Sequence, residues 1–272
     1  MGHFSAPPVP PGNPRAPVYL GNNLALCWLL GRFKFFVDST DSTMTPHFLY
    51  DGNWEMNITN LFTKVIHPGN VVLDVGANFG FYTVVAADAV GPRGKVYAIE
   101  AGPTNFGILR RNILINAFND RVTAFHNAAL NERKEVQLFQ QEIYAGGHSV
   151  FVADPKDSKY QRIAIQGVPI DDLIPEGTVD VVKIDVEGCE GLVFQGMTKL
   201  LERSRQVKIL MEWSPAMIRN SGVEPAAFLG LIRAQGFEVW LINAQSGLDK
   251  VSDSQLCAST TIDMLYLTRP LG

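Results

Sequence analysis

From residue 70 onward, short apolar runs alternate with segments in which apolar residues recur at helical spacing. The apolar runs predict strands at residues 71–75, 95–100, 121–130, 179–186, 207–213, 237–242 and 260–268. Helices are predicted between them, at residues 79–90, 103–117, 190–203 and 225–235. Alternation of this kind predicts a mainly parallel α/β sheet with helices on both faces. Ligands of such sheets bind beyond the carboxyl ends of the strands, so candidate functional residues are sought there.

The first 69 residues follow a different pattern. Residues 1–17 contain six prolines, which remove backbone donors and resist helix formation, so we expect a flexible leader. Residues 18–69 predict a small N-terminal cap, with a strand near 32–37, a turn at 50–55 and a helix at 56–66. The main domain is then expected to run from residue 70 to residue 272. Within it, residues 135–143 alternate in polarity and predict an added antiparallel strand.

Composition narrows the class of protein. The 272 residues are 46% hydrophobic and 18% charged, which excludes a mostly disordered chain. The net charge of −4 offers no basic excess for a phosphate backbone, so we expect no nucleic-acid partner. Three scattered cysteines argue against a disulfide scaffold, and no apolar run is long enough to predict a membrane span. We therefore expect a cytoplasmic location, while the sequence does not determine the oligomeric state.

The most distinctive motif is the glycine-containing loop after the first strand of the main domain. It reads Leu73-Asp-Val-Gly-Ala-Asn-Phe-Gly80, and Glu100 ends the next strand. Glycines let the backbone approach a ligand closely, and an acid at the tip of the second strand can accept both hydroxyls of a ribose. A dinucleotide site needs glycine where Asn78 and Phe81 stand. S-adenosyl-L-methionine is therefore the natural candidate cofactor, and Asp74 could help to position its amino group, directly or through water. The alternative is an ordinary strand-to-helix turn with a capping acid.

A second motif places three acids after the strand at 179–186, in the run Asp185-Val-Glu187-Gly-Cys-Glu190. Carboxylates crowded at a strand end alter each other's proton affinity, so one of them could act as a general base toward a hydroxyl. The alternative is that they stabilise a helix N-terminus. Glu212 ends the following strand at the same edge, with a structural ion pair as its alternative role.

Weaker candidates stay open beside these motifs. Asp185, Glu187 and Glu212 could hold Mg²⁺ or Ca²⁺ through oxygen ligands, but no compact aspartate-rich loop is present and we expect no metal. His126 and His148 are possible bases because histidine titrates near neutrality. A lone histidine is more often structural.

Together these motifs resemble those of the FkbM family of S-adenosylmethionine-dependent methyltransferases. The resemblance covers about residues 30–242, and the run Asp-Val-Glu-Gly-Cys-Glu from Asp185 to Glu190 is its most specific part. It implies a Rossmann-like class I methyltransferase sheet of seven strands, the last one antiparallel. It also implies methyl transfer, usually to oxygen, on sugars, glycolipids, polyketide-type products or other small metabolites.

The resemblance also implies roles for single residues. The methionine side of the cofactor would be lined by Asp74, Gly76, Asn78, Gly80 and Thr83. Glu100 would bind the ribose, and Asn127 and Ala128 would meet the adenine edge. Glu55, in a segment like the G-x-x-E of the family, would reach the cofactor or close the pocket. One departure is Ala101-Gly102, where family members often have proline.

The sequence therefore predicts an O-methyltransferase acting on a hydroxylated small molecule. Asp185, which also lies next to the cofactor, is the first candidate for the base, with Glu187 and Glu212 as further candidates. Two alternatives remain open: an N-methyltransferase, whose amine needs less help from a base, and a non-catalytic cofactor-binding protein. Turnover of bound cofactor would distinguish the non-catalytic protein from both kinds of methyltransferase.

Overall fold

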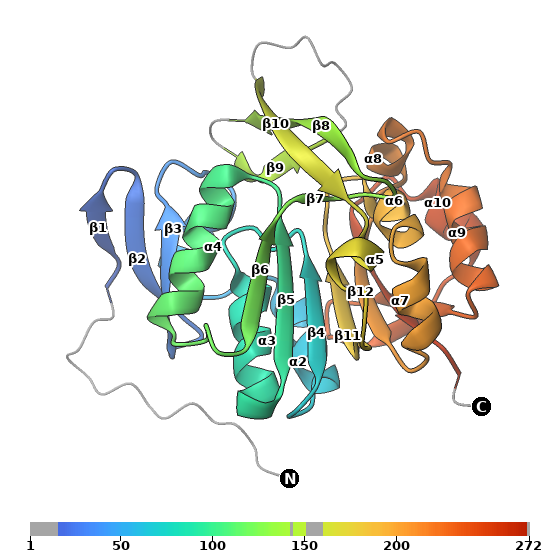
Figure 1. Cartoon of the computed structure of the whole chain (residues 1–272), viewed down its shortest axis with the longest axis horizontal. Coiled ribbons are helices and arrows are strands. Elements are labelled where there is room, and N and C mark those ends of the chain that lie inside the picture. The colour runs from blue at the N-terminus through green and yellow to red at the C-terminus, as the bar shows by residue number, and fades with distance from the viewer. Residues whose placement is uncertain (1–15, 142–143, 151–159, 271–272) are drawn as a thin grey trace.

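Figure 1 shows the computed structural model of the chain, which describes residues 16–141, 144–150 and 160–270. Nearly all of the predicted leader, residues 1–15, lies outside the described residues. So does the side chain of His148. No helix in the described ranges combines the length and hydropathy that crossing a membrane requires.

The centre of the molecule is a sheet of eight strands in the order β14-β13-β15-β12-β11-β4-β5-β6. Its members are β4 (Val71–Val75), β5 (Lys95–Glu100), β6 (Val122–His126), β11 (Val181–Ile184), β12 (Lys208–Trp213), β13 (Glu238–Ile242), β14 (Leu248–Lys250) and β15 (Asp263–Thr268). β15 runs antiparallel to both of its neighbours, β12 and β13. The seven predicted strands and the antiparallel last strand are confirmed, and the short edge strand β14 is an addition.

The central strands β4, β11 and β12 are mostly apolar because the sheet is buried on both faces there. In β4, Val72 joins the core on one face, while Leu73 and Val75 join the core on the other. The first face is covered by α2 (Met56–Val65), α3 (Phe81–Val90) and α4 (Pro103–Ile115). The second is covered by α5 (Ile170–Leu173), α6 (Glu190–Gln195), α7 (Thr198–Arg203), α8 (Pro215–Asn220), α9 (Pro225–Ala234) and α10 (Asp253–Ala258).

Two predicted elements are divided in the structure. The strand predicted at 121–130 is β6 followed by β7 (Ala128–Ala129), and β7 pairs in a different sheet. The helix predicted at 190–203 is interrupted between α6 and α7 at Gly196, where a Cβ would lie 2.0 Å from the carbonyl oxygen of Leu130. Close packing of this turn against the segment after β7 therefore breaks a helix that periodicity alone predicts to be continuous.

A second sheet, in the order β7-β10-β8-β9, lies beyond the carboxyl ends of the central strands (Figure 1). It contains β8 (Lys134–Gln141), β9 (Tyr144–Ser149) and β10 (Tyr160–Val168). β8 is the predicted strand at 135–143, and it pairs antiparallel with β10. This sheet brings Leu138 and Val150 to the edge where the site is expected.

The N-terminal region is a three-stranded antiparallel sheet and two helices. Its strands are β1 (Val18–Gly21), β2 (Leu24–Leu29) and β3 (Phe33–Asp38), followed by α1 (Met44–Tyr50) and α2. The ring of Phe48 stacks on Phe81 of α3 at 5.8 Å. The side-chain amide of Asn112 accepts from the Phe36 N–H at 2.6 Å and donates to its carbonyl oxygen at 2.9 Å. The region therefore shares one core with the central sheet.

Candidate functional site

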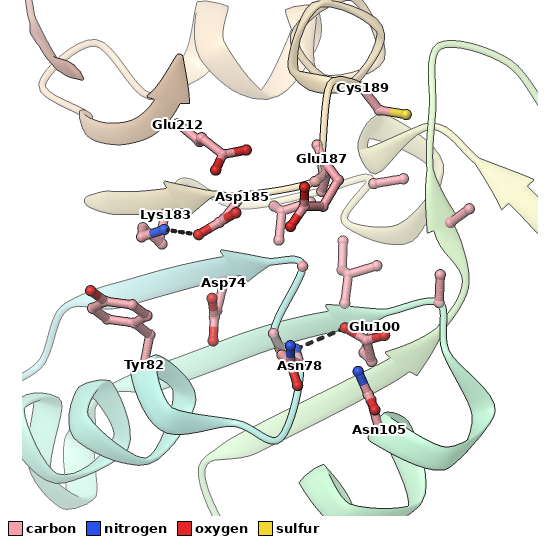
Figure 2. Close-up of a pocket in the computed structure, with 18 of the residues that line it drawn as sticks. Asp74, Asn78, Tyr82, Glu100, Asn105, Lys183, Asp185, Glu187, Cys189 and Glu212 are labelled. Atoms are coloured by element: carbon pink, nitrogen blue, oxygen red, sulfur yellow. Dashed lines mark hydrogen bonds and ion pairs between the residues drawn. The ribbon is translucent and has the colours of Figure 1, made fainter. Parts of the chain in front are cut away.

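A cavity of about 400 Å³ lies at the carboxyl edge of the central sheet. Ten predicted site residues line it: Glu55, Asp74, Gly76, Asn78, Glu100, Asn127, Ala128, Asp185, Glu187 and Glu212. Figure 2 shows two ends of the cavity, with Asn78, Glu100 and Asn105 at one and Lys183, Asp185 and Glu212 at the other. The first is called the glutamate-100 end below, and the second the acidic end.

The loop after β4 is shaped by backbone contacts on both sides. Gly76 adopts φ 82°, and a Cβ there would lie 1.8 Å from the carbonyl oxygen of Asp185. The N–H groups of Gly76 and Ala77 both donate to the carbonyl oxygen of Ile99 at 2.9 Å. Only glycine allows this loop to pack between the ends of β5 and β11, so the backbone of residues 76–78 is held facing the cavity.

Glu100 is the fixed acceptor at the tip of β5. Its two carboxylate oxygens accept the N–H groups of Asn78 and Gly102, each at 2.7 Å. Burial raises the pKa of Glu100 to about 7, although these two N–H groups oppose the shift. Each oxygen keeps a further lone pair for a ligand, so this carboxylate is oriented to accept two more hydrogen bonds.

Two predicted cofactor residues, Gly80 and Thr83, are not among the residues that line the cavity. Gly80 adopts φ 93° at the start of α3, against the side chain of Leu109. Thr83 donates from Oγ1 to Asp74 at 2.5 Å. Burial raises the pKa of Asp74 to about 6, and the bond from Thr83 opposes the shift. The structure thus gives Gly80 and Thr83 supporting positions behind the loop and behind Asp74.

The acidic end contains a buried cation that sequence reasoning gave no role. Lys183 is 1% exposed, and its Nζ lies 2.8 Å from Asp185 and 4.9 Å from the centre of the Tyr82 ring. The Tyr82 hydroxyl in turn donates to Glu55 at 2.9 Å. Burial alone would lower the pKa of Lys183, but the carboxylates of Asp185 and Glu55 outweigh it and the pKa is raised. Lys183 therefore stays charged and fixes one oxygen of Asp185.

The other acids at the acidic end have no cation from the described ranges bound to them, so burial raises their pKa values. Burial, and then the charges of Asp185 and Glu190, raise the pKa of Glu187 to about 8. Burial also raises the pKa of Glu212 well above its usual range, and Asp185 and Glu190 add to that shift. Glu190 does not line the cavity, because its Oε1 accepts the N–H groups of Val186 and Gly188. The predicted helix N-terminal role therefore applies to Glu190, while Asp185 and Glu187 face the cavity.

The glutamate-100 end continues along β7 to the second sheet. Asn127 donates its backbone N–H to the Glu100 carbonyl oxygen at 3.2 Å, and its side-chain amide donates to Gln166. Asn127 is thus fixed beside Glu100 and Ala128 follows it along the cavity wall, while their contact with the adenine edge stays a prediction. The wall there also includes Ala101, Leu138, Val150 and Cys189.

Several cavity residues were not predicted: Thr43, Met44, Trp54, Tyr82, Asn105 and Lys183 among them. Lys183 carried a usable signal, since it interrupts an apolar strand and lies on the same side of the strand as Asp185, two residues on. No sequence pattern pointed to Thr43, Met44 or Trp54 as site residues. They reach the cavity because the N-terminal region packs beside α3.

Of the two candidate histidines, only His126 has a side chain that the structure describes. His126 is exposed, stacks on Phe106 at 4.7 Å and is not among the lining residues. Within the described ranges, no group of three or more histidine, cysteine, aspartate or glutamate residues is arranged to hold a metal ion. Asp185, Glu187 and Glu212 share the cavity without forming such a group.

Comparison with known proteins gives a family match. Residues 74–239 match the family described as the methyltransferase FkbM domain. The match spans β4 to β13 and includes the glycine-containing loop, Glu100, the Asp185–Glu190 run and Glu212.

Three named methyltransferases are similar to the chain over parts of their length. The chain is 22% identical to the methyltransferase sdnD of Sordaria araneosa, covering 68% of this chain and 80% of that protein. It is 27% identical to the hexuronic acid methyltransferase AglP of Haloferax volcanii, covering 54% of this chain and 58% of AglP. It is 28% identical to the ribosomal protein L11 methyltransferase of Carboxydothermus hydrogenoformans, covering 52% of this chain. That match spans only 42% of the L11 enzyme.

Solved structures share the fold. A protein of Clostridium thermocellum that is proposed to be an rRNA methylase aligns with a TM-score of 0.50 at 12% identity. The alignment covers 79% of this chain and 96% of that one. At this identity the likeness shows the class I methyltransferase fold and nothing about the substrate.

Proposed function

The chain belongs to the FkbM methyltransferase family, and from that membership we propose that it transfers a methyl group from S-adenosyl-L-methionine to a hydroxyl of a small molecule. The acceptor class is a sugar, a glycolipid or a polyketide-type metabolite. The observation that carries the proposal is that Glu100 and Asp185 face one cavity from the tips of β5 and β11. The acid proposed to bind the ribose and the acid proposed to accept the proton therefore line the same cavity.

The residues at the glutamate-100 end fit the cofactor. The volume of about 400 Å³ is within the range of about 300–1,000 Å³ usual for small-molecule sites. The Glu100 carboxylate, held by two backbone N–H groups, would accept the two ribose hydroxyls. Gly76 presents backbone without a Cβ, and Asn127 and Ala128 would border the adenine. Asp74 would take the amino group of the methionine part, directly or through water.

When bound, the cofactor supplies an electrophilic methyl group on a positively charged sulfur. The protein has to align a hydroxyl with that methyl group and remove the proton of the hydroxyl. Asp185 is the proposed proton acceptor, because Lys183 binds one of its oxygens and leaves the other facing the cavity. Glu187 is the second candidate, since its raised pKa suits proton transfer near neutrality.

Residues 18–69 are proposed as a cap on the main domain, which would begin at residue 70. Met44, Trp54 and Glu55 bring the cap to the cavity wall. Glu55 adopts φ 40° immediately before α2 and accepts the Tyr82 hydroxyl. The cap would thereby exclude water from the acidic end and position the acceptor.

The test is a cofactor titration followed by an acceptor screen. Isothermal calorimetry should detect binding of S-adenosylmethionine and S-adenosylhomocysteine, and no comparable binding of NAD or NADP. A screen of hydroxylated sugars, glycolipids and macrolide-like products should then yield a product heavier by one methyl group, located on oxygen by fragmentation. A methyl group on nitrogen would support the N-methyltransferase instead. Cofactor binding without turnover on any acceptor would support the non-catalytic alternative.

A further inference from the structure

Glu212 carries a buried carboxyl oxygen that no residue of the described ranges hydrogen-bonds. The residue is 7% exposed, and its Oε2 meets no hydrogen-bond donor among the residues that the structure describes. Most buried polar atoms of native proteins are hydrogen-bonded, and leaving one bare destabilises the fold. A buried carboxyl oxygen without a hydrogen bond therefore destabilises the ligand-free protein. A bound ligand can remove this cost by supplying the hydrogen-bond donor.

Glu212 lies beside the proposed reaction centre. Ile184 of β11 pairs with Met211 of β12 in parallel register, so Asp185 and Glu212 follow the same pair on adjacent strands. Both line the cavity, and Figure 2 shows the Glu212 carboxyl facing Asp185 and Glu187, far from Glu100. A ligand group that reached Glu212 would therefore belong to the methyl acceptor and not to the cofactor.

The charges of the wall limit what that acceptor can be. Six carboxyl groups line the cavity: Glu55, Asp74, Glu100, Asp185, Glu187 and Glu212. The only cationic side chain among the lining residues that the structure describes is Lys183, which is already paired with Asp185. A carboxylate or phosphate on the acceptor would be buried at the acidic end without a free cation among these described residues to pair with it, which is unfavourable.

We propose that Glu212 is a specificity residue that hydrogen-bonds a second donor group of the acceptor, a hydroxyl or an ammonium group next to the methylated hydroxyl, and that acidic acceptors are excluded. The inference rests on the proposed function and deepens it. The acceptor is a polyhydroxylated or amino-bearing molecule without negative charge at the reacting end. Asp185 takes the proton of the reacting hydroxyl, and Glu212 holds its neighbour.

The first test compares two buried acids by thermal melting of the ligand-free protein. Glu190 is 1% exposed, but its Oε1 accepts two backbone N–H groups, so Glu190→Leu should lower the melting temperature. Glu212→Leu removes a bare polar atom and should raise the melting temperature by about 2–4 °C. A fall as large as that of Glu190→Leu would overturn the proposal, because Glu212 would then have a structural partner. Glu212→Gln is the milder variant and should not lower the melting temperature.

The second test uses a methyl glucoside and two derivatives that each differ from it at a single carbon: the 2-amino-2-deoxyglucoside, changed at C2, and the glucuronide, changed at C6. The glucoside or the aminoglucoside should be methylated, and the glucuronide should show at least a roughly 10-fold lower kcat/KM. Glu212→Leu should raise the acceptor KM about 10-fold and leave cofactor affinity unchanged. Preference for the glucuronide, or an unchanged KM in Glu212→Leu, would overturn the inference but not methyl transfer. Lack of turnover with all three would count against the proposed function, and melting would then decide the role of Glu212.

Discussion

The Nζ of Lys183 lies 2.8 Å from the Oδ2 of Asp185, and the two side chains are 1% and 30% exposed. A fully buried ammonium group thus anchors a carboxylate whose other side faces the cavity. The same ammonium lies over the ring of Tyr82, whose hydroxyl bonds Glu55 in the cap. Through Tyr82 and Glu55, the pair therefore connects the proposed proton acceptor to the proposed N-terminal cap.

Replacing the cation should affect catalysis more than cofactor binding. In Lys183→Met the length of the side chain is kept, but Asp185 loses the contact that orients it. We expect kcat to fall by about 10- to 100-fold, because alignment of the proton acceptor is lost, while the dissociation constant of S-adenosylhomocysteine changes little. Steady-state kinetics and calorimetry measure the two quantities. Weaker cofactor binding with an unchanged kcat would show that Lys183 serves the cofactor instead.

Asp185→Asn tests the assignment of the base. The substitution keeps the size of the side chain but removes its basic oxygen, so turnover should drop by roughly 10²–10⁴-fold with little change in cofactor affinity. Glu187→Gln is the matched variant and should have a smaller effect. Near-normal turnover in Asp185→Asn together with a large loss in Glu187→Gln would move the role to Glu187. EDTA should leave the activity intact, and a loss that Mg²⁺ restores would indicate a metal site.

Cofactor affinity should depend on pH through Glu100. Its pKa is raised to about 7 by burial, and only the ionised carboxylate can accept both ribose hydroxyls while it accepts two N–H groups. Affinity should therefore fall as the pH drops from 8 to 6. Glu100→Ala should weaken binding by about 10- to 100-fold, and Glu100→Gln should abolish the pH dependence. Calorimetry at three pH values tests this prediction. If the cofactor affinity of the wild-type protein does not change with pH, Glu100 does not bind the cofactor.

Gly76→Ala tests the close approach of the loop to β11. The new Cβ would lie 1.8 Å from the Asp185 carbonyl oxygen, at a residue with φ 82°. Gly177→Ala is the matched control, since Gly177 has φ 79° but no atom within 4 Å of the new Cβ. The control should lose about 1–2 kcal/mol of unfolding free energy from backbone strain alone. Gly76→Ala should lose more and also weaken cofactor binding. If urea denaturation shows that both variants lose the same unfolding free energy, the close contact between the loop and Asp185 is contradicted.

The ligand-free protein should become less stable as the pH rises. Burial raises the pKa of Glu190 and Glu100 to about 7 and that of Glu187 to about 8, above the ordinary value of 4.5. The folded state thus holds more protons than the unfolded state, and the slope of stability against pH is negative between those values. This stability is fully present below pH 4.5 and is lost as the pH rises through 7 to 8.

Melting scans from pH 5 to pH 8 should therefore show a falling melting temperature. Glu190→Gln, which keeps an acceptor oxygen for its two N–H groups, should flatten the decline. A melting temperature that rises over this range would contradict the burial of these carboxyls.

Much of the fold follows from the sequence, because local patterns determine it. Val181–Ile184 is apolar except for Lys183 since the strand is buried on both faces, and β15 was placed correctly for the same reason. Glu100 and Asp185 could be assigned to the site from sequence because both follow strands of one parallel sheet, whose carboxyl ends meet at one edge. The division at Gly196 could not be predicted, because its cause is contact with the Leu130 backbone, distant in the sequence.

The sequence by itself determined the class of fold, the position of the glycine-containing loop and the set of candidate acids. Only the tertiary structure decided which acids face the cavity and what each one contacts. Glu190 and Glu187 are three residues apart, yet one is bonded to backbone and the other faces the cavity. Lys183 pairs with Asp185, while the Oε2 of Glu212 stays without a donor in the described part of the chain. These differences arise from burial and hydrogen bonding across β4, β11 and β12, which bring together residues that no local pattern connects.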